Sequence, residues 1–315
     1  MYQFRLSNIG KKLESKANWI APIALGIALL AIAAASILIV IAETEITPNA
    51  ITCDRLLIAA VAFGIWNTLK VSNNDNLDSD ATLANQLYTS RAIALLLIAG
   101  ISFAISLALW AWSLTQTSIA NATLLNNMMP IFTTLGGWLI FRQQFSLRFL
   151  IGMAVAILGA VAIGIEDLQA AASHLTGDGA ALTAAMFSAI SILSLEQLRV
   201  QFSTAIIMQW TSLAGGLFLL PLVFFTQEQL LPVSVSGWLA VIGLGLISQA
   251  IGQGLLTYSL AKFSSGFIAV SMLSIPVIAA ILAMLLFAEQ LSLFNYLAFA
   301  IVLLGIYLAV SAKES

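Results

Sequence analysis

The chain has 315 residues, of which 61% are hydrophobic and 8% charged, and its formal net charge at neutral pH is −2. Soluble domains carry about 25% charged residues, so this composition excludes a soluble globular protein and leaves too few charges for a nucleic-acid-binding surface. One cysteine and one histidine exclude an intrachain disulfide and a cluster of thiolate or imidazole metal ligands. We therefore expect a protein of the lipid bilayer with no metal, no cofactor and no nucleic-acid partner.

Ten apolar runs follow one another along the chain, each long enough to cross a hydrocarbon core of ~30 Å as a helix. The first run, 19–42, is longer than the about 7–15 apolar residues of a signal peptide, so we interpret it as a membrane span. The other nine spans are expected at 50–69, 92–114, 118–141, 147–165, 179–199, 204–226, 236–259, 264–287 and 292–311.

Positive charge falls on one side of this ten-span arrangement. Eleven of the twelve lysines and arginines lie near the chain ends or in the loops on the same side, whereas Glu45, Asp178 and Glu228 lie in the opposite loops. The positive-inside rule then places both termini in the cytoplasm. We therefore expect a multi-pass protein of the inner (plasma) membrane, with cytoplasmic segments at 1–18 and 312–315.

The sequence repeats itself after 146 residues without a gap between 113 and 164. Pro130 aligns with Pro276, and FRQQFSL at 141–147 aligns with FAEQLSL at 287–293. Each copy holds five spans, an odd number, so the two copies must be inverted relative to each other. These patterns predict an all-α polytopic membrane protein of ten transmembrane helices in two inverted five-helix repeats, the architecture of secondary transporters. The expected boundaries are 19–165 for the first repeat, 166–178 for a periplasmic linker and 179–311 for the second repeat.

The order and spacing of these features resemble the drug/metabolite transporter superfamily, specifically its EamA-type members. The features are the two aligned prolines, the acidic Glu289 that follows helix 9, and the glycines Gly159 and Gly305 of the fifth helix in each repeat. The resemblance covers nearly the whole chain and implies a solute carrier, often an exporter of amino acids or related metabolites. One departure is Gln143, which stands where the family usually has a glutamate.

Polar side chains inside the hydrocarbon are candidates for function because their burial costs free energy. Gln249 and Gln253 are four residues apart and share a helix face, so they either bind a polar solute or hydrogen-bond neighbouring helices. Asn126 and Asn127 precede Pro130 by one turn. We interpret Asn127 as support for a kink and Asn126 as a candidate for the cavity, with Pro130 and Pro276 as kinks that act in gating.

Trp112 and Tyr258 are equivalent positions in the two repeats. They either belong to the interfacial aromatic belt or form the rim of the substrate cavity. Small residues recur every four positions in the fifth helix, at Ala156, Ala160 and Gly164. That spacing favours close helix packing, either within the chain or across a homodimer.

Three charged residues are candidates for ion pairing or proton coupling: Arg55, Glu196 and Glu289. Arg55 lies inside the second span, where it pairs with a carboxylate (Glu43, Glu45 or Asp54), extends outward to the membrane surface, or binds a carboxylate of the substrate. Glu196 is three residues before Arg199, so the two side chains are expected to pair on one surface.

The function predicted from the sequence is secondary transport of a small, weakly charged metabolite by alternating access, with a coupling proton as a further expected partner. No nucleotide-binding GxxxxGK[ST] loop is present, which excludes ATP-driven pumping by this chain alone. The alternatives are a non-transporting scaffold or receptor, and an intramembrane enzyme. The second alternative lacks the clustered acid, base or nucleophile that catalysis requires, so we predict that the protein is not an enzyme and has no catalytic residues.

Overall fold

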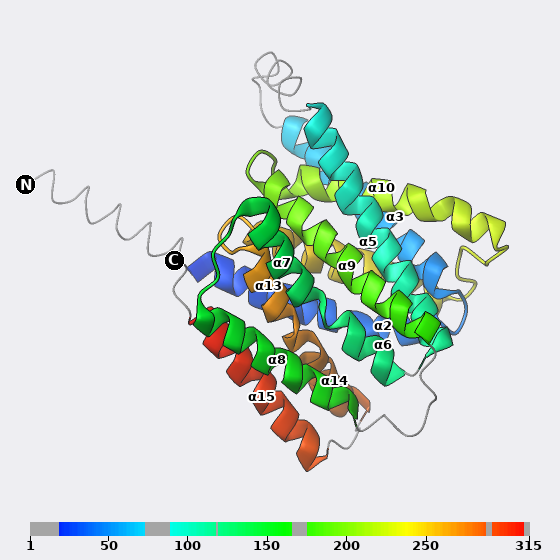
Figure 1. Ribbon diagram of the computed structural model, residues 1–315. Helices are drawn as coiled ribbons and strands as arrows, with labels where there is room; N and C mark the ends of the chain where they lie inside the picture. The colour runs from blue at the N-terminus through cyan, green and yellow to red at the C-terminus, as the bar shows by residue number, and fades with distance from the viewer. Residues whose placement is uncertain (1–18, 73–88, 118, 166–174, 288–291, 312–315) are drawn as a thin grey trace, which may run out of the picture.

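The computed structural model describes residues 19–72, 89–117, 119–165, 175–287 and 292–311, and the regular elements in these ranges are all helices (Figure 1). Among them, nine helices are long and apolar enough to cross a membrane, and a shorter apolar helix covers Leu147–Ala162. The predicted ten-helix polytopic fold is confirmed. The expected segments 1–18 and 312–315, most of the linker 166–178, and Glu289 lie outside the described residues.

The first repeat begins with the span Trp19–Ala42, whose second half is α2 (Ala35–Ala42). The rest of this repeat consists of α3 (Pro48–Ser72), α5 (Ser90–Gln116), α6 (Ile119–Asn126), α7 (Met129–Phe141) and α8 (Leu147–Ile165). The second repeat consists of α9 (Leu175–Arg199), α10 (Thr204–Phe225), the composite span α11 (Val235–Gly243), η1 (Leu244–Gln253) and α12 (Gly254–Ser259), then α13 (Ser265–Met272), α14 (Ser274–Phe287) and α15 (Leu293–Val310).

The loops gather at two ends of the bundle, which differ in charge. The basic end, where the first span begins and α15 ends (Figure 1), holds Lys70, Arg91, Arg142, Arg148, Arg199 and Lys262. The acidic end holds Glu43, Glu45, Asp178 and Glu228.

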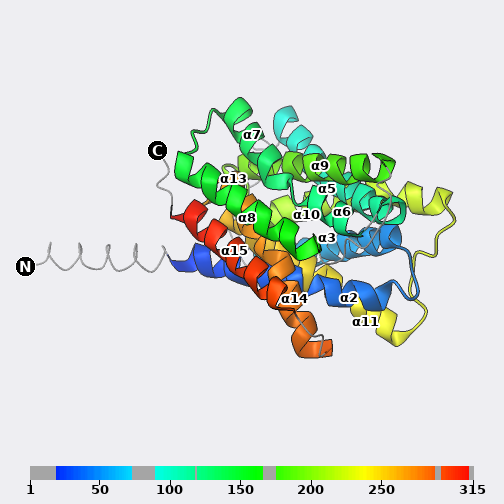
Figure 2. The same cartoon turned by 60° about the horizontal axis from the view of Figure 1, so that its bottom comes forward.

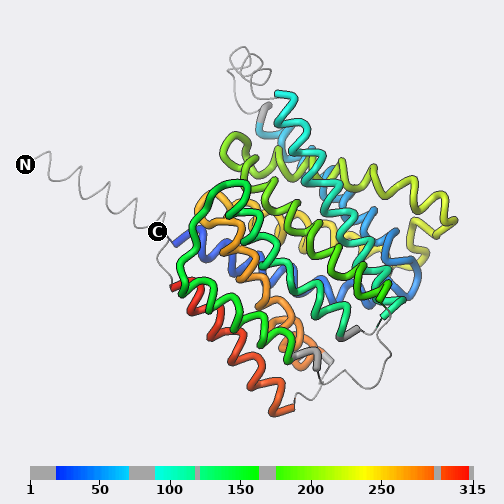
Figure 3. The backbone as a smooth tube through the Cα atoms, viewed as in Figure 1, coloured from blue at the N-terminus to red at the C-terminus, as the bar shows by residue number. Residues whose placement is uncertain are grey.

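Two spans, α6–α7 and α13–α14, are each divided into two helices (Figure 3). α6 ends at Asn126 and α7 begins at Met129, with Pro130 in its first turn; α14 begins at Ser274, with Pro276 in its first turn. Proline lacks an N–H group and clashes with the preceding turn, so it favours the start of a new helix. The side-chain nitrogen of Asn127 is buried without a hydrogen-bond partner, so it does not supply the support expected at this break.

The eighth span contains ten residues of π-helix, η1, in its middle. Segments of this kind are rare and occur frequently at functional sites. Glycines bring η1 close to its neighbours: a Cβ added to Gly245 would lie 2.5 Å from a methyl carbon of Ile58, and one added to Gly252 would lie 2.9 Å from Ile32.

Helices α8 and α15 run side by side at one edge of the bundle (Figure 2). A Cβ added to Gly305 would lie 2.2 Å from the backbone nitrogen of Ala156, and one added to Gly152 would lie 2.4 Å from the backbone nitrogen of Ala309. Ala156 and Ala160 are both buried. The small residues of α8 therefore serve packing within the chain, and they leave the predicted homodimer without support from this stripe.

We expect Gly305→Ala to destabilise the protein by about 2 kcal/mol, because the added methyl group meets backbone atoms of α8 that cannot move aside independently. The measurement is thermal unfolding of the purified protein in detergent. Gly26→Ala is the matched control, since a Cβ there would find no atom within 4 Å. Equal melting temperatures for the two variants would contradict the tight α8–α15 contact.

Candidate functional site

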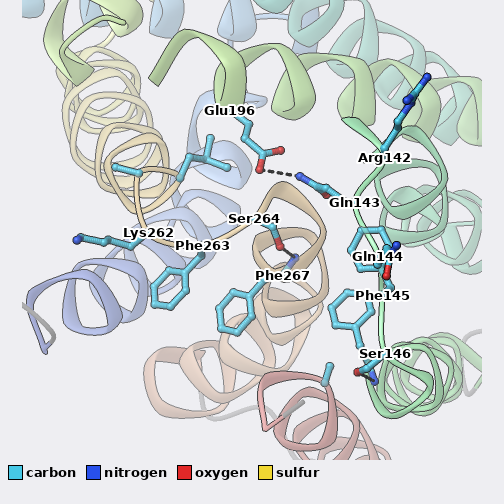
Figure 4. A pocket seen from close by; sticks show the side chains of 14 residues that line it. Arg142, Gln143, Gln144, Phe145, Ser146, Glu196, Lys262, Phe263, Ser264 and Phe267 are labelled. Atoms are coloured by element: carbon cyan, nitrogen blue, oxygen red, sulfur yellow. Dashed lines mark hydrogen bonds between the residues drawn. The ribbon is translucent and has the colours of Figure 1, made fainter. Parts of the chain in front are cut away.

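A cavity of about 700 Å³, which we call the vestibule, opens at the basic end (Figure 4). Its walls come from the α7–α8 connection, the end of α9 and the connection between α12 and α13. In Figure 4 the side chains of Gln143 and Glu196 point toward each other, whereas those of Arg142 and Lys262 point away from the centre. Gln143 and Glu196 therefore place an amide and a carboxylate side by side in the wall of the vestibule.

The end of α7 places Gln143 in the vestibule. Arg142 adopts a left-handed conformation with φ of 54°, which turns the chain back so that the Gln143 N–H donates to the Gly137 carbonyl at 3.1 Å. Gly137 has no side chain to obstruct the glutamine, whose Oε1 would lie 2.5 Å from a Cβ at that position. The Nε2 of Gln143 then donates to Oε1 of Glu196 at 3.1 Å (Figure 4). A glutamate at 143 would place a second carboxylate beside Glu196.

The pair expected between Glu196 and Arg199 is not formed. Arg199 turns toward backbone carbonyls instead, with Nε donating to Thr257 at 3.1 Å and a terminal nitrogen donating to Phe202 at 2.6 Å. Those carbonyls lie near helix ends, where they lack partners of their own. Within the described residues, Glu196 therefore accepts a hydrogen bond only from Gln143, through Oε1, and its Oε2 is buried without a hydrogen-bond partner.

Aromatic side chains also line the vestibule. Phe145 stacks on Phe149 with ring centroids 5.0 Å apart, and Phe263 stacks on Phe267 at 4.5 Å. A Cβ added to Gly266 would lie 3.1 Å from the Phe145 ring, so this glycine allows the two stacks to approach each other. The vestibule thus offers apolar surface beside one carboxylate.

A second, much smaller cavity lies within the bundle, between α3, α5, α9, α10 and η1; we call it the central cavity. Its volume of about 20 Å³ is room for roughly one water molecule. Gln249 and Gln253 both line it, as their shared helix face predicted. Gln249 is 2% exposed and its Oε1 has no hydrogen-bond partner; the same holds for Oγ of Ser212, which is 1% exposed. Sequence reasoning missed Ser212, because most serines in apolar helices bond to their own backbone.

Apolar side chains separate the two cavities. Leu195 lines the central cavity and Leu260 lines the vestibule, and both belong to one buried cluster that also includes Leu256 and Ile268. A solute in the vestibule would therefore reach the central cavity only after these side chains part.

The acidic end is held together by carboxylates that join the two repeats, which we call the latches. In the first latch, Glu45 accepts hydrogen bonds from the Ser234 hydroxyl, from the Ser234 N–H at 3.0 Å and from the Val233 N–H at 2.8 Å. These hydrogen bonds, with the larger effect from Ser234 and the smaller from Val233, hold the pKa of Glu45 below its ordinary value. The carboxylate therefore stays ionised at neutral pH, and hydrogen bonds to an ionised acceptor are the stronger kind.

Two further latches have the same design. Glu228 of the second repeat accepts from the Thr47 hydroxyl and from Nδ2 of Asn49 at 3.2 Å. Asp178 at the start of α9 accepts from the Thr117 hydroxyl at 2.7 Å. All three carboxylates cross from one repeat to the other, so any relative motion of the repeats that opens this end must break them.

Arg55 lies in α3 with 7% of its surface exposed. Its Nε has no hydrogen-bond partner, and its Cζ lies 5.9 Å from the centroid of the Phe103 ring, which also lines the central cavity. The expected carboxylate partners are not in contact with it: Glu45 is engaged with Ser234, and Oδ2 of the equally buried Asp54 has no partner. The structural ion pair expected for Arg55 is not formed.

The remaining candidates lie away from both cavities. Trp112 is 48% exposed and Tyr258 is 39% exposed, near opposite ends of the bundle, which favours the aromatic-belt interpretation over a cavity rim. Asn126 is half-buried at the end of α6 and is not among the residues that line either cavity.

Comparison with known proteins agrees with this architecture. The model of the EamA-like transporter family matches residues 19–165 and 175–311, one match for each repeat. A probable terminal-alkyne amino-acid exporter of Streptantibioticus cattleyicolor is 24% identical over 178 residues, and this match spans 56% of the chain and 59% of the relative. A solved crystal structure superposes with a TM-score of 0.76 over 92% of this chain and 96% of the other, at 17% identity, which shows the fold alone.

Cysteine labelling tests the placement of the two ends. Cys53, the only cysteine, is fully buried and its thiol donates to the Gly216 carbonyl, so we expect the unmodified protein not to react with a membrane-impermeant maleimide. We expect Gln144→Cys, at the vestibule, to react only in inside-out vesicles, and Gln229→Cys, at the acidic end, only in intact cells. Reaction of both variants from the same side would contradict the ten-span arrangement.

Proposed function

The chain belongs to the EamA-like transporter family, and from this we propose that it is a secondary transporter that exports small metabolites, namely amino acids or related weakly charged solutes. The observation that carries the proposal is a pathway open at one end only. The vestibule opens at the basic end, while the three latches close the acidic end. Inverted repeats around such a pathway are the basis of alternating access.

In the proposed cycle the basic end faces the cytoplasm of a plasma-membrane protein, in agreement with its positive charge. A solute enters the vestibule, passes the apolar cluster at Leu195 and Leu260, and binds at the central cavity between Gln249 and Gln253. The latches then open and release it outside. Export as the direction of transport is supported by the similarity to a probable amino-acid exporter.

The breaks before Pro130 and Pro276 are the proposed flexible points. At each break the regular α-helical pattern is interrupted, and three-residue hydrogen bonds, from Met128 to Leu125 and from Leu273 to Val270, take its place. The two halves of each span are therefore proposed to change their angle there. We further propose that a proton drives the cycle and that Glu196 receives it, because this carboxyl group faces the vestibule with one oxygen unpartnered. Glu289 is proposed for the same role at the opposite end from its sequence position alone.

Counterflow in proteoliposomes tests the proposed function. We expect vesicles loaded with a pool of unlabelled neutral amino acids to accumulate labelled amino acid transiently, and protein-free vesicles not to. We expect a pH gradient to accelerate accumulation in the wild type and to have no effect in Glu196→Gln. Absence of accumulation from pools of amino acids, amines and nucleobases, with monodisperse protein, would contradict transport of small metabolites.

The latches make a second prediction. Glu228→Ala removes both bonds of one latch, and hydrogen bonds to a charged group contribute roughly 1.5–3 kcal/mol each. We therefore expect a reporter cysteine in the central cavity, Ser212→Cys, to react with an impermeant maleimide from the acidic side about tenfold faster in the Glu228→Ala background. Glu43→Ala, an exposed glutamate at the same end, is the matched control. Equal rates in the two backgrounds would show that this latch does not hold the acidic end closed.

A further inference from the structure

The guanidinium of Arg55 lies in a buried residue, and its Nε has no hydrogen-bond partner. Removing a charge from water is strongly unfavourable unless an opposite charge or several hydrogen bonds replace the water. Its low exposure excludes the usual escape, in which a long basic side chain extends to the membrane surface. The Phe103 ring gives little compensation, because 5.9 Å is near the limit for a cation–π contact.

The acidic side chains of the described part of the chain do not neutralise this charge. Glu45 and Glu228 are engaged in latches, and Asp54 is the next residue along the helix, so its side chain leaves α3 in another direction. A buried cation that lacks a protein anion is arranged to receive one from a ligand. A carboxylate has the planar geometry that binds both arms of a guanidinium at once.

The central cavity beside Arg55 has the opposite polarity. Its unpartnered atoms are Oε1 of Gln249, which accepts hydrogen bonds, and Oγ of Ser212, a hydroxyl that can accept as well as donate. The backbone of Arg55 lies against η1, since a Cβ at Gly245, four residues before Gln249, would lie 3.4 Å from the Arg55 carbonyl oxygen. Phe103 lies beside the Arg55 guanidinium and also lines the central cavity.

These groups match the two charges of an amino acid. A carboxylate fits Arg55, an ammonium group fits the acceptor oxygens of Gln249 and Ser212, and an apolar side chain fits the remaining walls formed by Leu56, Leu195 and Met208. An unbranched amine would leave Arg55 unneutralised, and a simple carboxylic acid would leave the acceptor oxygens without a donor.

We propose that Arg55, Gln249 and Ser212 form a binding site for a neutral α-amino acid in its zwitterionic form, with Arg55 binding the carboxylate and Gln249 and Ser212 binding the ammonium group. The site deepens the proposed function and rests on it, because it names the class of solute. The central cavity as described holds about one water molecule, so the site forms fully when α3, α10 and η1 separate around the amino acid.

Binding to the detergent-solubilised full-length protein tests this site without requiring transport. The probes are three matched pools, made of neutral apolar amino acids, their amides, which lack the carboxylate, and the corresponding carboxylic acids, which lack the ammonium group. The measurement is the ligand-induced rise in melting temperature as a function of concentration. We expect the wild type to bind the amino acids on the order of 10- to 100-fold more tightly than either of the other pools.

Two variants separate the halves of the site. Arg55→Gln should weaken binding of the amino acids to the level of the amides without weakening binding of the amides, which make no contact that needs the guanidinium. Gln249→Leu should weaken the amino acids and the amides alike and spare the carboxylic acids. Because each variant retains binding of one pool, a loss confined to the others cannot come from misfolding. Arg55→Lys, which keeps the charge and loses the two-armed geometry, should recover part of the affinity.

Asp54→Asn is the matched control, as it changes the neighbouring side chain of equal burial. If it abolishes the preference for amino acids over amides as completely as Arg55→Gln does, Arg55 and Asp54 form a structural pair and the proposal is wrong. Amides that bind the wild type as tightly as the amino acids overturn it too, as does the absence of binding from the amino-acid pool. Counterflow of other solutes by a protein that fails these tests would leave the proposed transport intact and exclude the amino-acid site.

Discussion

Inside a bilayer each buried polar group must find its partner within the protein, and this constraint organises the molecule. Along the spans, hydroxyl groups satisfy it locally, as when Thr133, Thr211 and Ser271 donate to carbonyls four residues earlier. The charged groups at the acidic end satisfy it across the repeats through the latches. Exceptions occur at several places in the described part of the chain, among them Arg55 in α3 and two atoms of the central cavity, Oγ of Ser212 and Oε1 of Gln249. In the central cavity, a polar solute would supply the missing partners.

The same constraint explains why the fold could be predicted so fully from the sequence. A bilayer dictates the length and composition of each span, so the ten helices and the charge difference between the two ends were evident from the apolar runs and the lysines and arginines. The breaks beside Pro130 and Pro276 were indicated by the prolines, although their extent was not. The π-helical segment η1 was not foreseen, because the apolar pattern of ten residues does not distinguish five-residue from four-residue hydrogen bonding.

The site was predicted less well, because its geometry depends on contacts between distant residues. The glutamines of η1 were recognised from their shared face, since helical spacing alone brings them together. The contact between Gln143 and Glu196 depends on the left-handed backbone conformation of Arg142. No sequence pattern predicts that conformation for an arginine. Arg55 was expected to pair with a carboxylate, and only the positions of Glu45 and Asp54 reveal that it does not. Ser212 resembled any other serine in an apolar helix.

The contact between Gln143 and Glu196 has a consequence for the resting state of the empty carrier. If the two repeats were identical, the states open to either side would be related by a two-fold rotation and have equal free energy, and the empty protein would divide its time between them. Here three carboxylates accept the hydrogen bonds that join the repeats at the acidic end. At the basic end, bonds between the repeats run to the amide oxygens of Gln209 and Gln197 and, beside the vestibule, from Gln143 to Glu196. In the proposed cycle, this difference between the two ends lowers the free energy of the state that is open at the basic end. The unloaded protein therefore rests open toward the cytoplasm, where the solute to be exported accumulates.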